Sequence, residues 1–168
     1  MRIVVGEGSC GIAAGARKVR AALEALVPTG GMNGQDARSS SVGVTGCIGM
    51  CYLEPIVDLY DESDARLGQR TSTSVAVLGA TRPTMRLVRV QEKDAERIHA
   101  AAVSGDLAGV KDLEISEEDK QFLAKQTRIA LRHCGVIDPE SLDSYRATDG
   151  YKAIAKILGK GGDAPMRP

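Results

Sequence analysis

Hydrophobic and polar positions in the first 60 residues predict short strands around one helix. An apolar run at 2–5 predicts a buried strand. Behind it, apolar side chains recur at helical spacing from Ile12 to Leu26, which predicts an amphipathic helix. Further apolar runs at 42–44 and 56–60 predict two more strands, which flank the sequence TGCIGMC. The polar, glycine-rich residues 28–41 predict a loop.

The same α/β pattern continues to residue 109. The runs SVAVL (74–78) and MRLVRV (85–90) predict strands that are joined by a turn. Residues 92–104 predict a helix. We therefore expect an α/β fold with a small mixed sheet flanked by helices.

Beyond residue 109 the pattern predicts helices only. Ser116 is placed to cap a helix that runs to about His133, and Asp138 to cap a second one. A third helix is expected at about 150–158. The chain thus divides into an α/β domain and a short all-helical segment, at residues 1–109 and 110–168.

Composition excludes several classes of function. The formal net charge is zero, and aromatic residues make up only 3% of the chain, so neither nucleic acid nor an anionic membrane is expected as a partner. No apolar run is long enough to cross a membrane, and the start of the chain has no signal-peptide pattern, which favours a cytoplasmic location. Four cysteines in such a chain favour metal ligands, redox groups or core residues over disulfides.

The glycine pattern after the first strand has two interpretations. Gly6, Gly8 and Gly11 form G-x-G-x-x-G, which is typical of a dinucleotide-binding turn. Such a turn requires an acidic residue at the end of the second strand and further parallel βαβ units, and neither is present. A nucleotide would also leave Cys10, in the middle of the turn, without a role. The pattern therefore favours a metal site.

Two further cysteines stand in a second glycine-rich loop. Cys47 and Cys51 are separated by three residues, and interleaved glycines allow backbone N–H groups to turn toward thiolate sulfurs. Cys10 precedes a helix, where the helix dipole also favours a thiolate. Because both loops lie at the same end of the predicted sheet, the three cysteines can converge on one site.

Three stretches resemble a known family: GEGSCGIAAGARKV, VTGCIGMCYLEPIVDLYD and FLAKQTRIALRHCGVIDPESLDSYRATDGYKAIAKIL. They resemble the N-terminal region of the NADH-binding flavoprotein subunit of bacterial NADH dehydrogenases, and look most like the versions in multimeric NAD(P)-linked hydrogenases and formate dehydrogenases. The resemblance implies a thioredoxin-like [2Fe-2S] ferredoxin domain, with a domain that binds FMN and NAD(H) beyond Pro168. It also implies other subunits of a complex I-like, NADH-oxidising complex as partners. Residues 68–85 fit the family less well and are expected to be an insertion.

The ligand pattern of the family is incomplete in this chain. Thioredoxin-like ferredoxins hold their cluster through Cys-x4-Cys and Cys-x3-Cys. Cys47 and Cys51 match the second pair, Cys10 matches the second member of the first pair, and Val5 stands where the first cysteine belongs. The resemblance thus implies Cys10, Cys47 and Cys51 as metal and cofactor ligands. A [2Fe-2S] cluster takes four ligands, so the fourth is left to Ser9, a backbone group, water or a partner chain.

Two functions remain open at this point. In the first, the domain passes electrons between a [2Fe-2S] cluster and the neighbouring flavin. In the second, it is a cluster-free thioredoxin-like scaffold for subunit docking. Three retained thiols favour the first, and Val5 favours the second. A thiol oxidoreductase would require Cys-x-x-Cys at the helix start, which Cys10 does not form.

No catalytic residues are expected in this chain. It has no arrangement of nucleophile and base, and no phosphate-binding loop of the GxxxxGK type. Cys134 is expected to be a small core residue at the end of its helix. His99 and His133 are expected on helix surfaces or helix ends.

Overall fold

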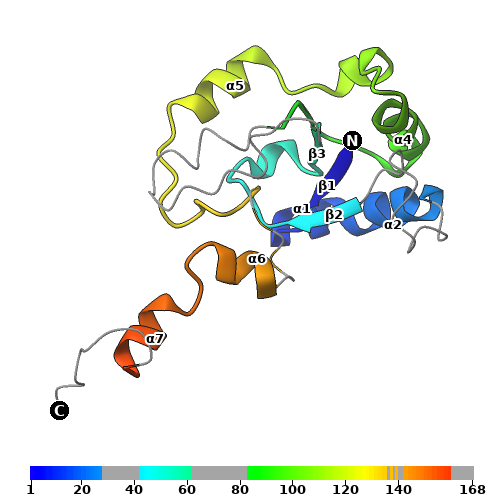
Figure 1. The fold of residues 1–168 in the computed structure, drawn as a ribbon. Coiled ribbons are helices and arrows are strands. Elements are labelled where there is room, and N and C mark those ends of the chain that lie inside the picture. The colour runs from blue at the N-terminus through cyan, green and yellow to red at the C-terminus, as the bar shows by residue number, and fades with distance from the viewer. Residues whose placement is uncertain (28–41, 62–82, 136, 138, 140–141, 160–168) are drawn as a thin grey trace.

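A four-stranded mixed sheet forms the centre of the structure, a computed structural model (Figure 1). It describes residues 1–27, 42–61, 83–135, 137, 139 and 142–159. The strand order is β2-β1-β3-β4, formed by Val42–Thr45, Arg2–Gly6, Val57–Tyr60 and Met85–Leu87. β1 pairs in parallel with β2 and antiparallel with β3, which in turn pairs antiparallel with β4. This arrangement confirms the predicted mixed sheet and is that of thioredoxin-like folds.

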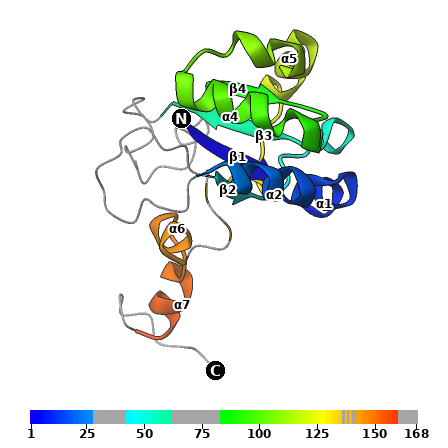
Figure 2. The same ribbon diagram turned by 90° about the vertical axis from the view of Figure 1, so that its right-hand side faces the viewer.

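One face of the sheet is covered by helices. The parallel β1–β2 pair requires a crossover, which α1 (Ser9–Ala14) and α2 (Ala16–Leu26) provide. Figure 2 shows α2 and α4 (Ala95–Ser104) on the same side of the sheet. Residues from β1, β3, α2 and α4 share a single aliphatic core on this side, which includes Ile3, Val5, Val19, Leu23, Val57, Leu59, Ile98 and Ala102. Burial of these side chains removes apolar surface from water, and this stabilises the layer of helices on the sheet.

The predicted helix from Ile12 to Leu26 is interrupted, so that prediction was wrong in its continuity. Gly15 adopts a left-handed conformation with φ of 105°, and its N–H bonds to the carbonyl of Ile12. Glycine reaches this conformation without a steric cost, which ends α1 and lets α2 start in a new direction. Within the apolar stripe, only Ala16, Val19 and Leu23 are fully buried, and all three lie in α2.

The opposite face of the sheet has a buried polar network. Arg86 on β4 donates two hydrogen bonds of 2.7 Å to its cross-strand partner Asp58 on β3. Asp58 alternates with the core residues of β3, so its side chain lies on the face away from α2 and α4. Tyr60 follows on this same face and donates a 2.7 Å hydrogen bond to the carbonyl of Gly135. Burial raises the pKa of the Tyr60 hydroxyl, so this group remains a donor at physiological pH.

Strand β4 is shorter than the predicted strand at 85–90. The chain leaves the sheet after Leu87, and Arg89 adopts a positive φ of 53°. The predicted helix at 92–104 is confirmed as a 3-10 turn, Glu92–Asp94, followed by α4. A further 3-10 helix, Ala108–Leu113, leads to a bridge between Leu87 and Glu114.

Beyond this bridge, three helices are described. α5 (Glu117–Ala124) is capped as predicted, because the Ser116 hydroxyl accepts a 3.1 Å hydrogen bond from the Asp119 N–H. α5 ends at Ala124 and does not reach His133, so its predicted length was wrong. α6 (Leu142–Ala147) and α7 (Lys152–Ile157) project from the sheet in both views, and α7 confirms the predicted third helix.

Some sequence predictions lie outside the described residues. They concern the loop at 28–41, the strand at 74–78, nearly all of the insertion at 68–85 and the cap at Asp138. The division at 109/110 stays a prediction, although Val110 and Ile115 are both buried in the cores of the α/β part.

We expect Arg86→Ala to destabilise the fold strongly. It would leave the 2%-exposed Asp58 carboxylate buried without its cation, at a cost of about 3–5 kcal/mol. Urea denaturation measures this loss as a fall in the free energy of unfolding. Arg17→Ala removes the same side chain from the exposed face of α2, and should change stability by less than about 0.5 kcal/mol. Equal losses of stability in the two variants would show that the buried ion pair does not stabilise the fold.

Candidate metal centre

Cys47 and Cys51 lie together on the loop between β2 and β3. Their Sγ atoms are 3.7 Å apart, and Cys51 begins a 3-10 turn, Cys51–Leu53. Two thiolates bound to one tetrahedral metal ion, with bonds of about 2.3 Å, lie about 3.8 Å apart. The separation of the two sulfurs therefore fits a pair of ligands on one metal ion.

A backbone N–H group points to one of these sulfurs. The Gly49 N–H donates a 3.3 Å hydrogen bond to Cys47 Sγ, and Gly49 has a positive φ of 93° that favours glycine. Burial raises the pKa of the Cys47 thiol, and this hydrogen bond lowers it. The predicted role of an interleaved glycine is confirmed at this position.

The loop that leads into α1, just before Cys10, touches the loop that contains Cys47. A Cβ atom at Gly8 would lie 2.6 Å from the Cβ of Cys47, which is closer than two non-bonded carbon atoms can approach. Cys10 itself is exposed in the first turn of α1. Among the described residues, no three His, Cys, Asp or Glu side chains are close enough together to hold a metal ion. The structure thus brings Cys47 and Cys51 together, and the ligand role of Cys10 stays a prediction.

Close packing explains the G-x-G-x-x-G pattern without a nucleotide. A Cβ at Gly11 would lie 2.4 Å from the Gly6 carbonyl oxygen and 3.0 Å from Glu54 Oε2. A Cβ at Gly8 would overlap Cys47 in the same way. Two of the three glycines are therefore required because β1, α1 and the cysteine loop approach one another closely.

Cys134 lies next to the cysteine loop, although it is distant in the sequence. It follows α5, is half-buried, and its Sγ lies 3.2 Å from the position that a Cβ at Gly46 would occupy. Burial raises the pKa of its thiol and nearby Arg128 lowers it, while Cys47 raises it further. The expectation that Cys134 ends a helix inside the core was wrong. No spacing in the sequence indicates this position, because the contact depends on how the segment after α5 folds back.

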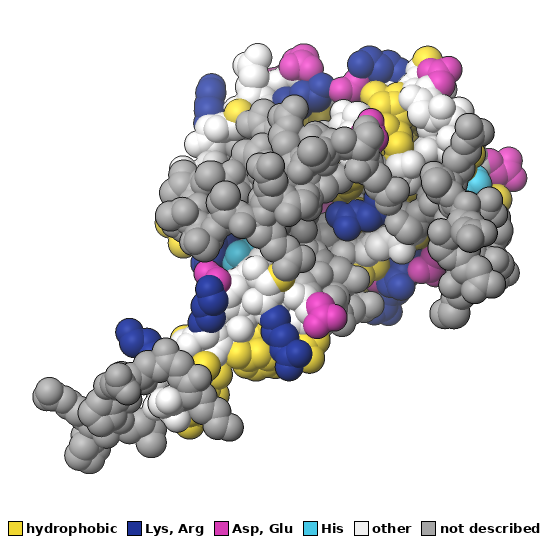
Figure 3. Space-filling view, in the orientation of Figure 1, with side chains coloured by type: hydrophobic (Ala, Val, Ile, Leu, Met, Phe, Trp, Pro, Cys, Tyr) yellow, Lys and Arg dark blue, Asp and Glu magenta, His cyan; other side chains and the backbone are white. Residues whose placement is uncertain are grey.

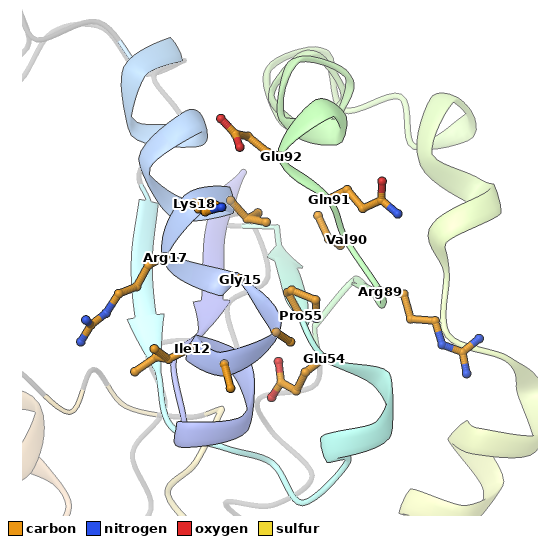
Figure 4. Close-up of a pocket in the computed structure, with 13 residues that line it drawn as sticks. Ile12, Gly15, Arg17, Lys18, Glu54, Pro55, Arg89, Val90, Gln91 and Glu92 are labelled. Carbon is orange, nitrogen blue, oxygen red and sulfur yellow. The ribbon is translucent and has the colours of Figure 1, made fainter.

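Glu54 lines a groove beside the cysteine loop. The groove has a volume of about 660 Å³, and its walls are α1, the start of α2 and residues 89–92. Figure 4 shows the Glu54 side chain between α1 and Pro55, whereas Arg17 and Arg89 point away from it. The Ile56 N–H donates a 2.9 Å hydrogen bond to Glu54 Oε2. Burial raises the pKa of this carboxyl group, an effect that the hydrogen bond from Ile56 opposes.

Exposed apolar side chains are concentrated on the two last helices. Figure 3 shows hydrophobic atoms at the surface around α6 and α7. They belong to Leu142, Tyr145, Tyr151, Ile154, Ile157 and Leu158, which are 47–60% exposed. None of the described helices combines the length and the apolar character that a membrane crossing requires.

Comparisons with known proteins give a short sequence match and a likeness to solved structures. No family model matches the chain. A stretch of 34 residues is 62% identical to the NADP-reducing hydrogenase subunit HndC of Solidesulfovibrio fructosivorans. This match covers 20% of the chain and only 7% of HndC. It confirms, for that stretch, the resemblance to a subunit of a hydrogenase.

The structural likeness is to a solved thioredoxin-like [2Fe-2S] ferredoxin from Aquifex aeolicus. It covers 69% of this chain and 96% of the ferredoxin, with 18% sequence identity and a TM-score of 0.45. The thioredoxin-like assignment of this chain follows from its strand order and strand directions.

We expect Gly8→Ala to separate the two loops of the site. The added methyl group would overlap Cys47, and such overpacking costs about 1–3 kcal/mol. Gly43→Ala is the matched control, because a Cβ there would meet nothing within 4 Å. The free energies of unfolding in urea compare the two variants. If Gly8→Ala is as stable as Gly43→Ala, the close approach of the loops is not required.

We expect Glu54→Gln to flatten the pH dependence of stability. Because the folded-state pKa of Glu54 is raised above its usual value of 4.5, folding favours the protonated carboxyl group. This contribution is fully present below the unfolded pKa and is lost as the pH rises through the raised folded pKa. The variant should lose less stability than the wild type across this window, as measured by urea denaturation at successive pH values. Parallel profiles would contradict the prediction.

Proposed function

We propose that this chain is the electron-relay and assembly part of an NADH dehydrogenase-like flavoprotein subunit, and that it holds a [2Fe-2S] cluster. The main observation in favour is the Cys47–Cys51 pair, whose 3.7 Å separation suits two ligands on one metal ion. The match to a hydrogenase subunit supports the same proposal. We propose Cys10 as a third ligand, because it lies in the first turn of α1 and Gly8, just before this helix, contacts Cys47.

The residues around the pair fit a negatively charged sulfur site. The Gly49 N–H points to Cys47 Sγ and stabilises negative charge there. Cys51 is exposed at the end of the same loop, which leaves it accessible to a metal ion. A bound [2Fe-2S] cluster would supply one-electron transfer to or from a neighbouring flavin.

Assembly is the second part of the proposal. The exposed apolar side chains of α6 and α7 would be covered by the FMN- and NAD(H)-binding domain or by other subunits of an NADH-oxidising complex. A large exposed apolar patch on a protein surface often marks a site of interaction with another protein.

A cluster-free docking scaffold is the alternative. Val5, which replaces the first ligand of the family, is fully buried in the core, and no described group of three side chains is assembled to hold a metal ion. In that case Cys47 and Cys51 would be two unligated thiols on a surface loop.

Anaerobic reconstitution with iron and sulfide distinguishes the two functions. The wild-type chain is expected to bind about two irons and, after dithionite reduction, to give the S = 1/2 EPR signal of a reduced [2Fe-2S] cluster. Cys47→Ala and Cys51→Ala should lose the iron and the signal, because each removes half of the ligand pair.

Ser104→Ala is the matched control for these variants, since it also removes one small polar group but lies on α4. It should leave iron content and EPR signal unchanged. A wild-type chain that is folded but binds no iron would establish the scaffold function.

A further inference from the structure

We propose that Cys134 is the fourth thiolate of the site, in place of the cysteine that is missing at Val5. This inference rests on the proposed function, and it concerns a residue outside the two cysteine loops. The structural observation behind it is the contact between the Cys134 side chain and the residue before Cys47.

The Cys134 thiol lies against the backbone of Gly46. Its Sγ is 3.2 Å from the position that a Cβ would occupy there, which is tighter than an ordinary van der Waals contact. Any larger residue at position 46 would push the thiol away. A glycine immediately before Cys47 thus allows a third sulfur to approach the Cys47–Cys51 pair.

The backbone next to Cys134 is held on both sides. The Gly135 N–H donates a 2.6 Å hydrogen bond to Thr45 Oγ1, and its carbonyl accepts the 2.7 Å hydrogen bond from Tyr60. Gly135 has a positive φ of 79°, which favours glycine at this turn. Arg128 donates a 3.1 Å hydrogen bond to the carbonyl of Cys134 itself. The position of the thiol is therefore set by several independent contacts.

Val5 has no side-chain atom that can bind iron, so the fourth ligand must come from elsewhere. Val5 is fully buried and pairs with Val44 and Val57 inside the sheet. A [2Fe-2S] cluster takes four thiolates in its usual form, and the chain has four cysteines. When a cysteine binds iron, an Fe–S bond replaces the S–H bond, and the proton is released to solvent.

The test compares cysteine variants after anaerobic reconstitution of the whole chain with iron and sulfide. The Cys134→Ala variant should bind at most half as much iron as the wild type, or give an EPR signal with different g-values. Cys134→Ser, in which an oxygen can replace the sulfur, should retain iron with shifted g-values. Alkylation of each cysteine, measured by mass spectrometry with and without the cluster, should show that Cys134 is protected when the cluster is bound.

Two glycine variants test the position of the thiol while all cysteines are retained. Gly46→Ala would displace Cys134 Sγ and should shift the g-values or lower the iron content. Gly43→Ala is the control, because a Cβ at Gly43, on the neighbouring strand β2, would meet nothing within 4 Å, and it should behave as the wild type. Circular dichroism checks that each variant is folded.

The outcomes separate this inference from the proposed function. If Cys134→Ala keeps the wild-type iron content and g-values, and Cys47→Ala loses both, Cys134 is not a ligand and the fourth ligand is Ser9, water or a backbone group. The electron-relay function would then still stand. If the folded wild-type chain binds no iron, both proposals are overturned.

Discussion

The buried ion pair between Arg86 and Asp58 is the interaction on which the candidate site depends. It joins β3 to β4 in direct register on the face of the sheet opposite to α2 and α4. Two parallel N–H···O bonds fix the guanidinium group geometrically as well as electrostatically. Tyr60 stands two residues from Asp58 and donates its hydroxyl to the Gly135 carbonyl. Through these contacts a polar network inside the sheet holds the segment that contains Cys134 beside the cysteine loop.

Close backbone approach is the second constraint on the site. The loop before α1, the loop after β2 and the turn at Gly135 meet where side chains would not fit, and glycines stand at the points of contact. The G-x-G-x-x-G pattern that is typical of a nucleotide site has a different physical origin in this chain. Gly8 and Gly11 leave space for Cys47 and for the Gly6 carbonyl, respectively. The same glycine pattern can thus bind a nucleotide or allow close packing, and only the neighbouring residues show which of the two applies.

The periodicity of apolar residues predicted where the four described strands lie and where α2, α4, α5 and α7 lie. β3 shows this pattern directly, because every second side chain enters the aliphatic core, while Asp58 and Tyr60 between them are buried in the polar network on the opposite face. The ends of elements were less predictable. Gly15 interrupts the first helix through a left-handed conformation, and α5 stops at Ala124 although apolar residues continue after it. Neither event has a signal in the hydrophobic pattern, because glycine is tolerated inside helices and Ala124 is a good helix former.

The sequence by itself determined the α/β class, the strand order along the chain and the closeness of Cys47 to Cys51. The last of these follows from spacing, since three intervening residues with two glycines can return the chain on itself. The tertiary structure alone decided that Val5 is sealed in the core and that Cys134 lies against Gly46. Contacts between residues far apart in the sequence depend on how whole elements pack, and a local pattern holds no information about that packing. The side chains that fix Gly135 come from β2 and β3, so the place of Cys134 exists only once the sheet has formed.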